Sequence, residues 1–254
     1  MFEATVSEGV LRLRRPGTRW LSTGWDGGRS RAATAYNVSV PEGFDRTDLA
    51  AYRDERLARA GFGAEGDVEG DREAAPTLFT GVSMDHARGA RLGPVVAYAT
   101  VGLSNPAMLP VDSEAASVAG TADAAEPRES TGRTDARPDP GTVNLIVGAT
   151  RRLAPGAAAN LVAVAAEAKA ATLLATAGVP GTTSDAVVVA DDPAGEPAEF
   201  SGSATAVGGA ARACVRDAVR ASLRSRYPDG DVPGPAADAE HGVVTDERAE
   251  VFDP

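Results

Sequence analysis

One segment constrains the fold of this chain more than any other, the run "PGAAANLVAVAAEAKAATLLATAG" at 155–178. It begins with Pro and ends with Gly, the residues that helices favour in their first turn and just past their last. At about 100° per residue, one face gathers Leu161, Val164, Ala165, Ala168 and Thr172, and Ala163, Ala170 and Leu174 lie roughly opposite. A helix that is apolar nearly all round is predicted to be buried.

Two charged residues interrupt this helix. Glu167 falls on the second apolar face, and Lys169 lies beside Val162 and Leu173. Neither charge can be buried alone, because the loss of hydration is costly. Two interpretations therefore stay open: both side chains reach solvent at the helix edge, or both point into a polar pocket where their pKa values are perturbed.

The rest of the chain predicts strands around this helix and two further helices. Runs rich in β-branched or aromatic residues predict strands within 32–40, 76–84, 93–103, 141–150 and 186–190. Helices are predicted within 45–61 and 204–227. Strands dominate early and strand–helix alternation follows, which indicates an α+β fold, with α/β as the alternative: a single domain whose mixed β-sheet is covered by helices.

The length of 254 residues suits one domain, which we place at 1–228. Within it, 112–140 has no periodicity and too few apolar residues for a core, so it is predicted to be a disordered insert. The remainder, 229–254, is predicted to be an acidic, disordered tail.

The composition excludes several classes of function. The net charge is −11, from 36 acidic and 25 basic residues, which disfavours a nucleic-acid partner because phosphates would be repelled. Lys169 is the single lysine and glutamine is absent, a bias typical of a salt-adapted cytoplasm such as that of haloarchaea. With no apolar run of about 18 residues and no secretory signal, we expect a cytoplasmic protein without a membrane partner.

Metal and thiol chemistry have little support. The only histidines are His86 and His241, and no H-x-H, H-E-x-x-H or C-x-x-C motif is present, so a zinc site is not expected. The single cysteine, Cys214, sits among Ala and Val on a predicted helix and is interpreted as a small core residue. The many Asp and Glu residues leave a metal-assisted hydrolase open.

Polar, glycine-containing loops adjoin several predicted strands. "GTTSDAVVVA" at 181–190 is either a turn capped by Asp185 or a loop whose backbone N–H groups, Thr182, Thr183 and Ser184 bind a hydroxyl or an oxyanion. It matches neither a phosphate loop nor a nucleophile elbow. Asn105 in "GLSNP" and Asn144 in "GTVN" are two of only four asparagines, and "LSTGWDGG" at 21–28 is a Gly-rich turn with two hydroxyls, most simply a hairpin.

Taken together, these stretches resemble the CbiZ family, the adenosylcobinamide amidohydrolases. The matching segments cover about residues 20–220 in family order: "LSTGWDGG", "PTLFTGVSM", "TVGLSNPA", "GTVNLIVGATRRLAPGAAANLVAVAAEAKAATL", "GTTSDAVVVA" and "FSGSATAVGGAARACVRDAV". The combination of "GTVN", "EAKAATL" and "GTTSDAVVV" is the specific part. The insert at 112–140 and the tail depart from the family pattern, and we expect both to leave the site intact.

The resemblance implies an activity in corrinoid salvage. The corrinoid substrate, adenosylcobinamide, would lose the aminopropanol that is held in amide linkage to its corrin ring, giving adenosylcobyric acid. The cobalt belongs to the substrate, so neither a protein-bound cofactor nor a protein-bound metal is implied. The rival interpretation is a non-catalytic corrinoid-binding protein, which would need no proton-transferring carboxylates. A third interpretation, an unrelated small-molecule kinase or nucleotide binder, is weakened by the missing phosphate-loop lysine.

Under this interpretation, amide hydrolysis needs a proton carrier and a group that stabilises the oxyanion. We expect Asp185 or Glu167 to handle protons and Lys169 to tune a carboxylate or to donate to the leaving group. The residues expected to bind substrate or the oxyanion are Asn105, Asn144, Thr182, Thr183, Ser184 and Thr23. A nucleophilic hydroxyl and an activated water both stay open as the attacking group.

Overall fold

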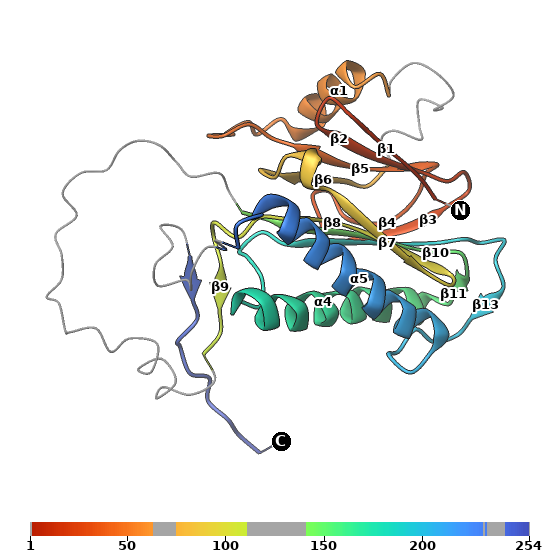
Figure 1. Cartoon of the computed structure of the whole chain (residues 1–254). Coiled ribbons are helices and arrows are strands. Elements are labelled where there is room, and N and C mark those ends of the chain that lie inside the picture. Colours follow the sequence, from red (N-terminus) through yellow and green to blue (C-terminus); the bar gives the residue numbers. More distant parts are fainter. Residues whose placement is uncertain (1, 63–74, 111–140, 231, 233–241, 254) are drawn as a thin grey trace, which may run out of the picture.

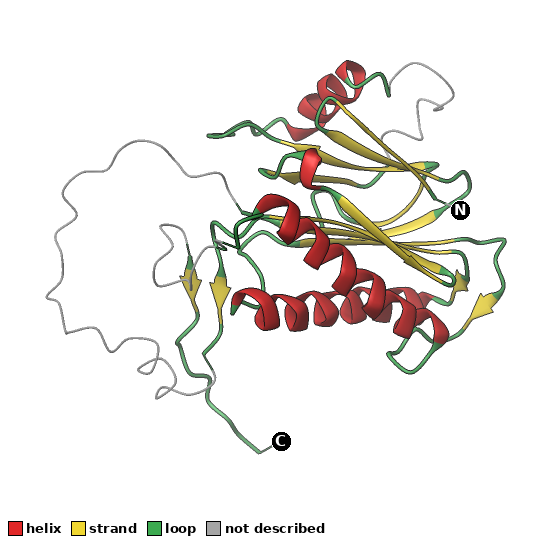
Figure 2. Cartoon of the chain, viewed as in Figure 1, coloured by secondary structure: helices red, strands yellow, loops and turns green. Residues whose placement is uncertain are grey.

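The computed structural model describes residues 2–62, 75–110, 141–230, 232 and 242–253. The expected insert at 112–140 and His241 lie outside these residues. The described elements stack in four layers: one helix, a four-stranded sheet, a six-stranded sheet and a pair of long helices (Figure 1; Figure 2).

The six-stranded sheet forms the centre of the molecule. Its order is β4 (Gly28–Arg31), β3 (Arg19–Ser22), β12 (Ala186–Asp191), β10 (Val143–Ala149), β8 (Val95–Val101) and β7 (Arg88–Leu92). β10 and β12 run parallel, and every other pair is antiparallel. The middle strands read as continuous apolar runs because both of their faces are covered.

The four-stranded sheet packs on one face of this central sheet. Its order is β1 (Glu3–Ser7), β2 (Val10–Arg14), β5 (Thr34–Ser39) and β6 (Thr77–Thr80). The helix α1 (Leu49–Arg59) lies on its outer side (Figure 1), with Tyr52 and Leu57 buried in the same core as Val38. The short elements are η1 (Met84–His86) and the pairs β11 (Arg152–Leu153) with β13 (Pro197–Ala198) and β9 (Ala107–Met108) with β14 (Val243–Val244).

The alternation of side chains along β10 separates the two hydrophobic cores. Val143, Leu145 and Val147 belong to the core beneath the long helices, whereas Ile146 belongs to the core between the sheets. This is the two-residue period of a strand with both faces covered. Asn144, on the same side as Ile146, therefore lies between the two sheets.

The long helices α4 (Pro155–Ala177) and α5 (Ala206–Arg226) cover the other face of the central sheet. α4 ends at Gly178, which has a left-handed φ of 71°. The prediction that this helix is buried on nearly all sides was wrong. The face with Leu161 is buried, but Leu174 on the opposite side is 52% exposed. By length and composition α4 could cross a membrane, yet it packs against β12 and α5 as a core helix does.

The predicted α+β class is confirmed, and so are the main helices and strands. One mixed sheet was expected, and the chain forms two that stack. The edge strand β7 was not predicted, because its sequence "RGARL" is mostly exposed and lacks apolar alternation. In the tail, Val243–Val244 pairs with β9.

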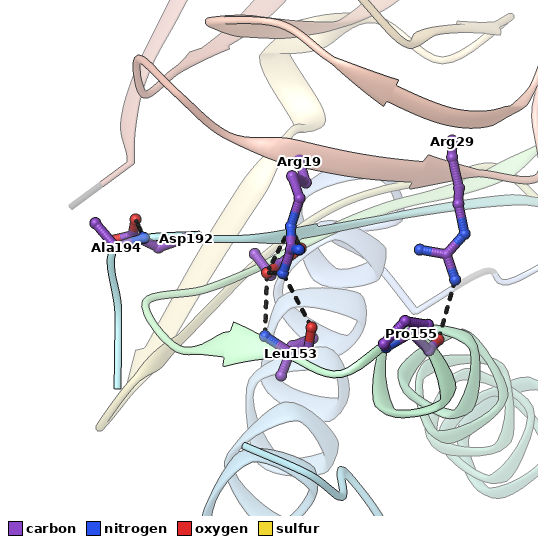
Figure 3. A network of polar contacts seen from close by, with 7 residues as sticks. Arg19, Arg29, Leu153, Pro155, Asp192 and Ala194 are labelled. Atoms are coloured by element: carbon purple, nitrogen blue, oxygen red, sulfur yellow. Dashed lines mark hydrogen bonds and ion pairs between the residues drawn. The ribbon is translucent and has the colours of Figure 1, made fainter. Parts of the chain in front are cut away.

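A polar network joins the start of β3 and the end of β12 to the residues that lead into α4 (Figure 3). Asp191, 5% exposed, accepts hydrogen bonds from Arg19 Nε at 3.1 Å and from Leu153 N at 3.0 Å. Arg29 donates to the carbonyl of Pro155 at 3.1 Å. The hydrogen bond with Asp191 raises the pKa of Arg19. The contacts of Asp191 fix the end of the sheet opposite the site described next.

Candidate active site

The polar loops predicted from the sequence meet at one end of the central sheet. β10 and β12 begin at this end, and their antiparallel neighbours β8 and β3 finish there. The residues that gather here, called the strand-end site below, are Thr23, Asn105, Thr142, Asn144, Lys169, Thr182, Thr183, Ser184 and Asp185.

Asp185 lies at the centre of the strand-end site. One carboxylate oxygen, Oδ1, accepts from Val143 N at 2.9 Å and from the Thr182 hydroxyl. The other, Oδ2, accepts from Thr182 N at 3.1 Å and from Lys169 Nζ. The carboxylate thereby joins its own loop to β10 and to α4.

Lys169 reaches this cluster from α4 and is only 9% exposed. Its ion pair with Asp185 supplies the partner that a buried ammonium requires. Gly181 makes the approach feasible, because a Cβ there would lie 2.4 Å from Asp185 Oδ2 and 2.6 Å from Lys169 Nζ. A side chain at 181 would force the pair apart.

Hydroxyl and amide groups form the outer rim of the site. Thr183 and Ser184 are exposed. Asn105 Nδ2 donates to Thr183 Oγ1 at 2.6 Å, and the hydroxyls of Thr142 and Ser184 are 3.0 Å apart. Asn105 is 8% exposed, and its Oδ1 is buried without a hydrogen-bond partner in the described part of the chain.

Asn144 extends the polar cluster between the two sheets. It is 2% exposed, and its Nδ2 donates to Asn37 Oδ1 and to the carbonyl of Phe79, both at 3.0 Å. Asn37 in turn donates to Thr100 Oγ1 at 3.0 Å. Asn144 Oδ1, like that of Asn105, has no partner among the described residues.

Three residues of this network were not among the expected site residues: Asn37, Thr100 and Thr142. Asn37 carried one signal, since asparagine occurs at only four positions and three of them lie in or against the site. Thr100 and Thr142 carried none, because threonine is common in strands and turns.

Thr23 and Glu167 differ in their relation to the site. Thr23 accepts a hydrogen bond from Val187 N at 2.9 Å through its hydroxyl and so extends the pairing of β3 with β12. The Glu167 side chain is 63% exposed, and its carboxylate lies 3.6 Å from Arg212 of α5. Two residues turn a helix by about 200°, so Glu167 points away from the side of α4 that presents Lys169.

Comparison with known proteins gives the family. The family model of the adenosylcobinamide amidohydrolases, CbiZ, matches residues 3–230. A Halobacterium salinarum protein named adenosylcobinamide amidohydrolase is 55% identical over 254 residues, which is 100% of both chains. The chain belongs to the adenosylcobinamide amidohydrolase family. The family resemblance drawn from the sequence motifs is confirmed.

A solved structure is also similar to this chain, at much lower sequence identity. It is a Burkholderia sp. beta-aminopeptidase with 15% identity and a TM-score of 0.38, over 87% of this chain and 80% of that one. A likeness of this size says nothing about fold or activity.

The remaining reactive side chains of this amidohydrolase-family chain lie apart from Asp185. Cys214 is buried against the carbonyl of Val95, and burial raises the pKa of its thiol, as expected of a core residue. His86 Nδ1 is 3.1 Å from Ser225 Oγ, and burial, followed by the charge of Arg226, lowers the pKa of this histidine. Among the residues that the structure describes, no three His, Cys, Asp or Glu side chains form a metal-binding group.

Proposed function

We propose that this protein hydrolyses the amide that links aminopropanol to the corrin ring of adenosylcobinamide. The products are adenosylcobyric acid and aminopropanol, and the acid returns to cobamide synthesis. Family membership and 55% identity over the full length of a relative with that name support the reaction. The observation that carries the site is the buried Lys169–Asp185 pair among loop hydroxyls at the sheet end.

In this proposal Asn105 recognises a carboxamide group of the substrate, and Asn144 supports the strand ends. The free Oδ1 atoms of Asn105 and Asn144 are acceptors, and a corrinoid offers many amide N–H donors. A buried acceptor left unpaired costs about 1–3 kcal/mol, so a donor from substrate or solvent there would be stabilising. Asn105 lies nearer the rim and meets the substrate, while Asn144 sits deeper and orients the strand ends.

Lys169 and Asp185 handle charge in the proposed reaction. The Asp185 oxygens are engaged by four donors, so the carboxylate holds Lys169 and the Thr182 hydroxyl in place. If the Thr182 hydroxyl is the attacking group, its proton passes to Asp185. Lys169 lies where it would stabilise the tetrahedral oxyanion or donate to the leaving amine. The exposed Glu167 has no part in this scheme.

The chemical balance is that of amide hydrolysis. The carbonyl C–N bond breaks, an oxygen from water ends on the carbonyl carbon, and a proton passes to the leaving aminopropanol nitrogen. The attacking oxygen belongs either to a loop hydroxyl, which then forms an ester that water cleaves, or to water itself. We propose no protein-bound cofactor, because the cobalt arrives with the substrate, and we place the protein in the cytoplasm on its composition.

The test is hydrolysis of adenosylcobinamide in high salt, followed by mass spectrometry for adenosylcobyric acid. We expect Asp185→Asn and Lys169→Met to lower kcat at least about 100-fold. Glu167→Gln is the matched control on the exposed side of α4 and should stay within about twofold of the wild type, because surface ion pairs contribute little. Corrinoid binding by the wild type without product would instead favour a non-catalytic binding protein.

A further inference from the structure

A cavity lies beside the strand-end site. It has a volume of about 320 Å³ and lies between the turn after β3, the start of β6 and helix α1, with Ser22, Trp25, Asp26, Arg53 and Thr77 in its lining. We call it the Trp25 pocket. Ser22 directly precedes Thr23, so the pocket and the strand-end site meet at the end of β3.

Trp25 lines the pocket and packs edge-on against Phe79 of β6. Its ring centroid is 5.7 Å from that of Phe79, at an interplanar angle of 61°. The carbonyl of Phe79 accepts the hydrogen bond from Asn144 at 3.0 Å. A ligand seated against Trp25 would therefore lie one residue away from the polar network of the strand-end site.

Arg53 is a buried cation in the wall of this pocket. It is only 6% exposed, and its guanidinium carbon lies 5.9 Å from the Trp25 ring centroid. Nε donates to Asp54 at 2.9 Å, and no hydrogen bond from Nη1 or Nη2 is present among the described residues. Nη1 and Nη2 are not among the buried unpaired atoms, so they are accessible where Arg53 lines the cavity and can donate to a ligand with acceptor atoms.

The turn after β3 holds Trp25 and Asp26 at the pocket. Asp26 has a φ of 48°, in the left-handed region that Asp tolerates better than most residues. A Cβ on Gly27 would lie 2.5 Å from the carbonyl oxygen of Ser22, so only glycine lets the turn fold back on the end of β3. The turn thus places an aromatic residue and a carboxylate in the lining of the same cavity.

The groups of the pocket match a purine nucleoside. A purine stacks on an aromatic ring, its ring nitrogens accept from a guanidinium, and ribose hydroxyls donate to a carboxylate. A bare phosphate would be attracted by Arg29 and Arg53, but it has no flat face to stack on Trp25. The volume is near the lower limit of about 300 Å³ for small-molecule pockets, too small for a corrin ring but suited to a nucleoside.

We infer that the Trp25 pocket binds the adenosyl group of the substrate while the strand-end site receives the amide arm. This inference rests on the proposed function. It makes Trp25, Arg53 and Asp26 specificity residues that distinguish adenosylated from non-adenosylated corrinoids.

The kinetic test compares hydrolysis of adenosylcobinamide with that of dicyanocobinamide, which lacks the nucleoside. The wild type should have a KM about tenfold lower for the adenosylated form. Trp25→Ala should remove this difference by raising that KM alone, with kcat within about twofold, and Trp25→Phe should keep most of it. Arg46→Gln is the matched control, because Arg46 lies 5.2 Å over the Tyr52 ring outside the pocket lining.

A binding test needs no catalysis. 5′-Deoxyadenosine alone should bind the wild type in calorimetry and lose binding in Trp25→Ala and in Arg53→Gln, whose folding is checked by thermal unfolding. Equal KM values for both corrinoids, or no binding of 5′-deoxyadenosine, would overturn the pocket assignment and leave the hydrolase intact. Nucleoside binding without hydrolysis of either corrinoid would overturn the proposed function and leave the nucleoside pocket standing.

Discussion

At the residue scale, Lys169 is the informative side chain. Every other basic residue of the chain except the two histidines is arginine, and this one lysine is buried against Asp185. A compact ammonium with three donors fits a space that a planar guanidinium would fill differently. The geometry of the pair therefore favours lysine over arginine at this position.

Removing one member of this pair should be worse than removing both. Lys169→Met leaves the largely buried Asp185, whose side chain is 13% exposed, without its cation, and we expect a loss of about 3 kcal/mol in the free energy of unfolding. The double variant Lys169→Met/Asp185→Asn should recover part of that loss, because no lone charge remains. Chemical unfolding of the two single variants and the double variant forms the cycle. Strictly additive losses would contradict an energetically coupled pair.

His86 should make stability depend on pH. Burial lowers the pKa of His86, so between its folded pKa and the ordinary value of 6.5 the unfolded chain binds more protons than the folded chain. Its contribution to the unfolding free energy is complete well above pH 6.5 and declines as the pH falls through 6.5 towards the folded pKa. The stability of the wild type relative to His86→Gln should therefore drop between about pH 7.5 and pH 5.5. A constant difference would mean that the imidazole is solvated.

At the element scale, an aspartate at each end of strand β12 forms an ion pair, and we expect the two aspartates to differ in their effects on catalysis and stability. Asp185 at its start belongs to the strand-end site, and Asp191 at its end pairs with Arg19. Six residues of strand separate the two ends by about 20 Å. The first aspartate should therefore affect catalysis and stability, and the second stability alone.

Asp191→Asn tests this separation. It weakens charged hydrogen bonds to Arg19 and Leu153, so we expect a loss of about 2 kcal/mol in stability. Below the unfolding temperature, kcat and KM for adenosylcobinamide should match those of the wild type. A selective fall in kcat in a folded Asp191→Asn protein would show that the far end of the sheet communicates with the reaction.

At the scale of the whole molecule, the net charge of −11 dominates the behaviour in solution. Added salt shortens the Debye length from about 10 Å at 0.1 M to about 3 Å at 1 M, which weakens repulsion between surface carboxylates. The midpoint of thermal unfolding should therefore rise steadily from 0.1 M to 2 M KCl. A midpoint that stays flat or falls would contradict the salt-adapted surface inferred from the composition.

The sequence by itself determined the features that depend on neighbours along the chain. Helix α4 has a proline in its first turn and a glycine just past its end, and the apolar runs at β8, β10 and β12 are bounded by glycine-containing loops. Helix capping, hydrophobic periodicity and turn propensity depend on residues close together in the chain, so the sequence alone predicts the helices and strands that they define. The polar loops at the strand ends were found for the same reason.

Only the tertiary structure decided what depends on contacts between distant segments. Glu167 and Lys169 interrupt the same apolar helix two residues apart. The helical periodicity is compatible with either side chain entering a polar pocket. Packing against β12 and α5 buries Lys169 on Asp185 and leaves Glu167 in solvent. The stacking of two sheets, which joins Asn37 to Asn144, is likewise set by a burial choice between surfaces far apart in the chain, and no local pattern encodes which surfaces will meet.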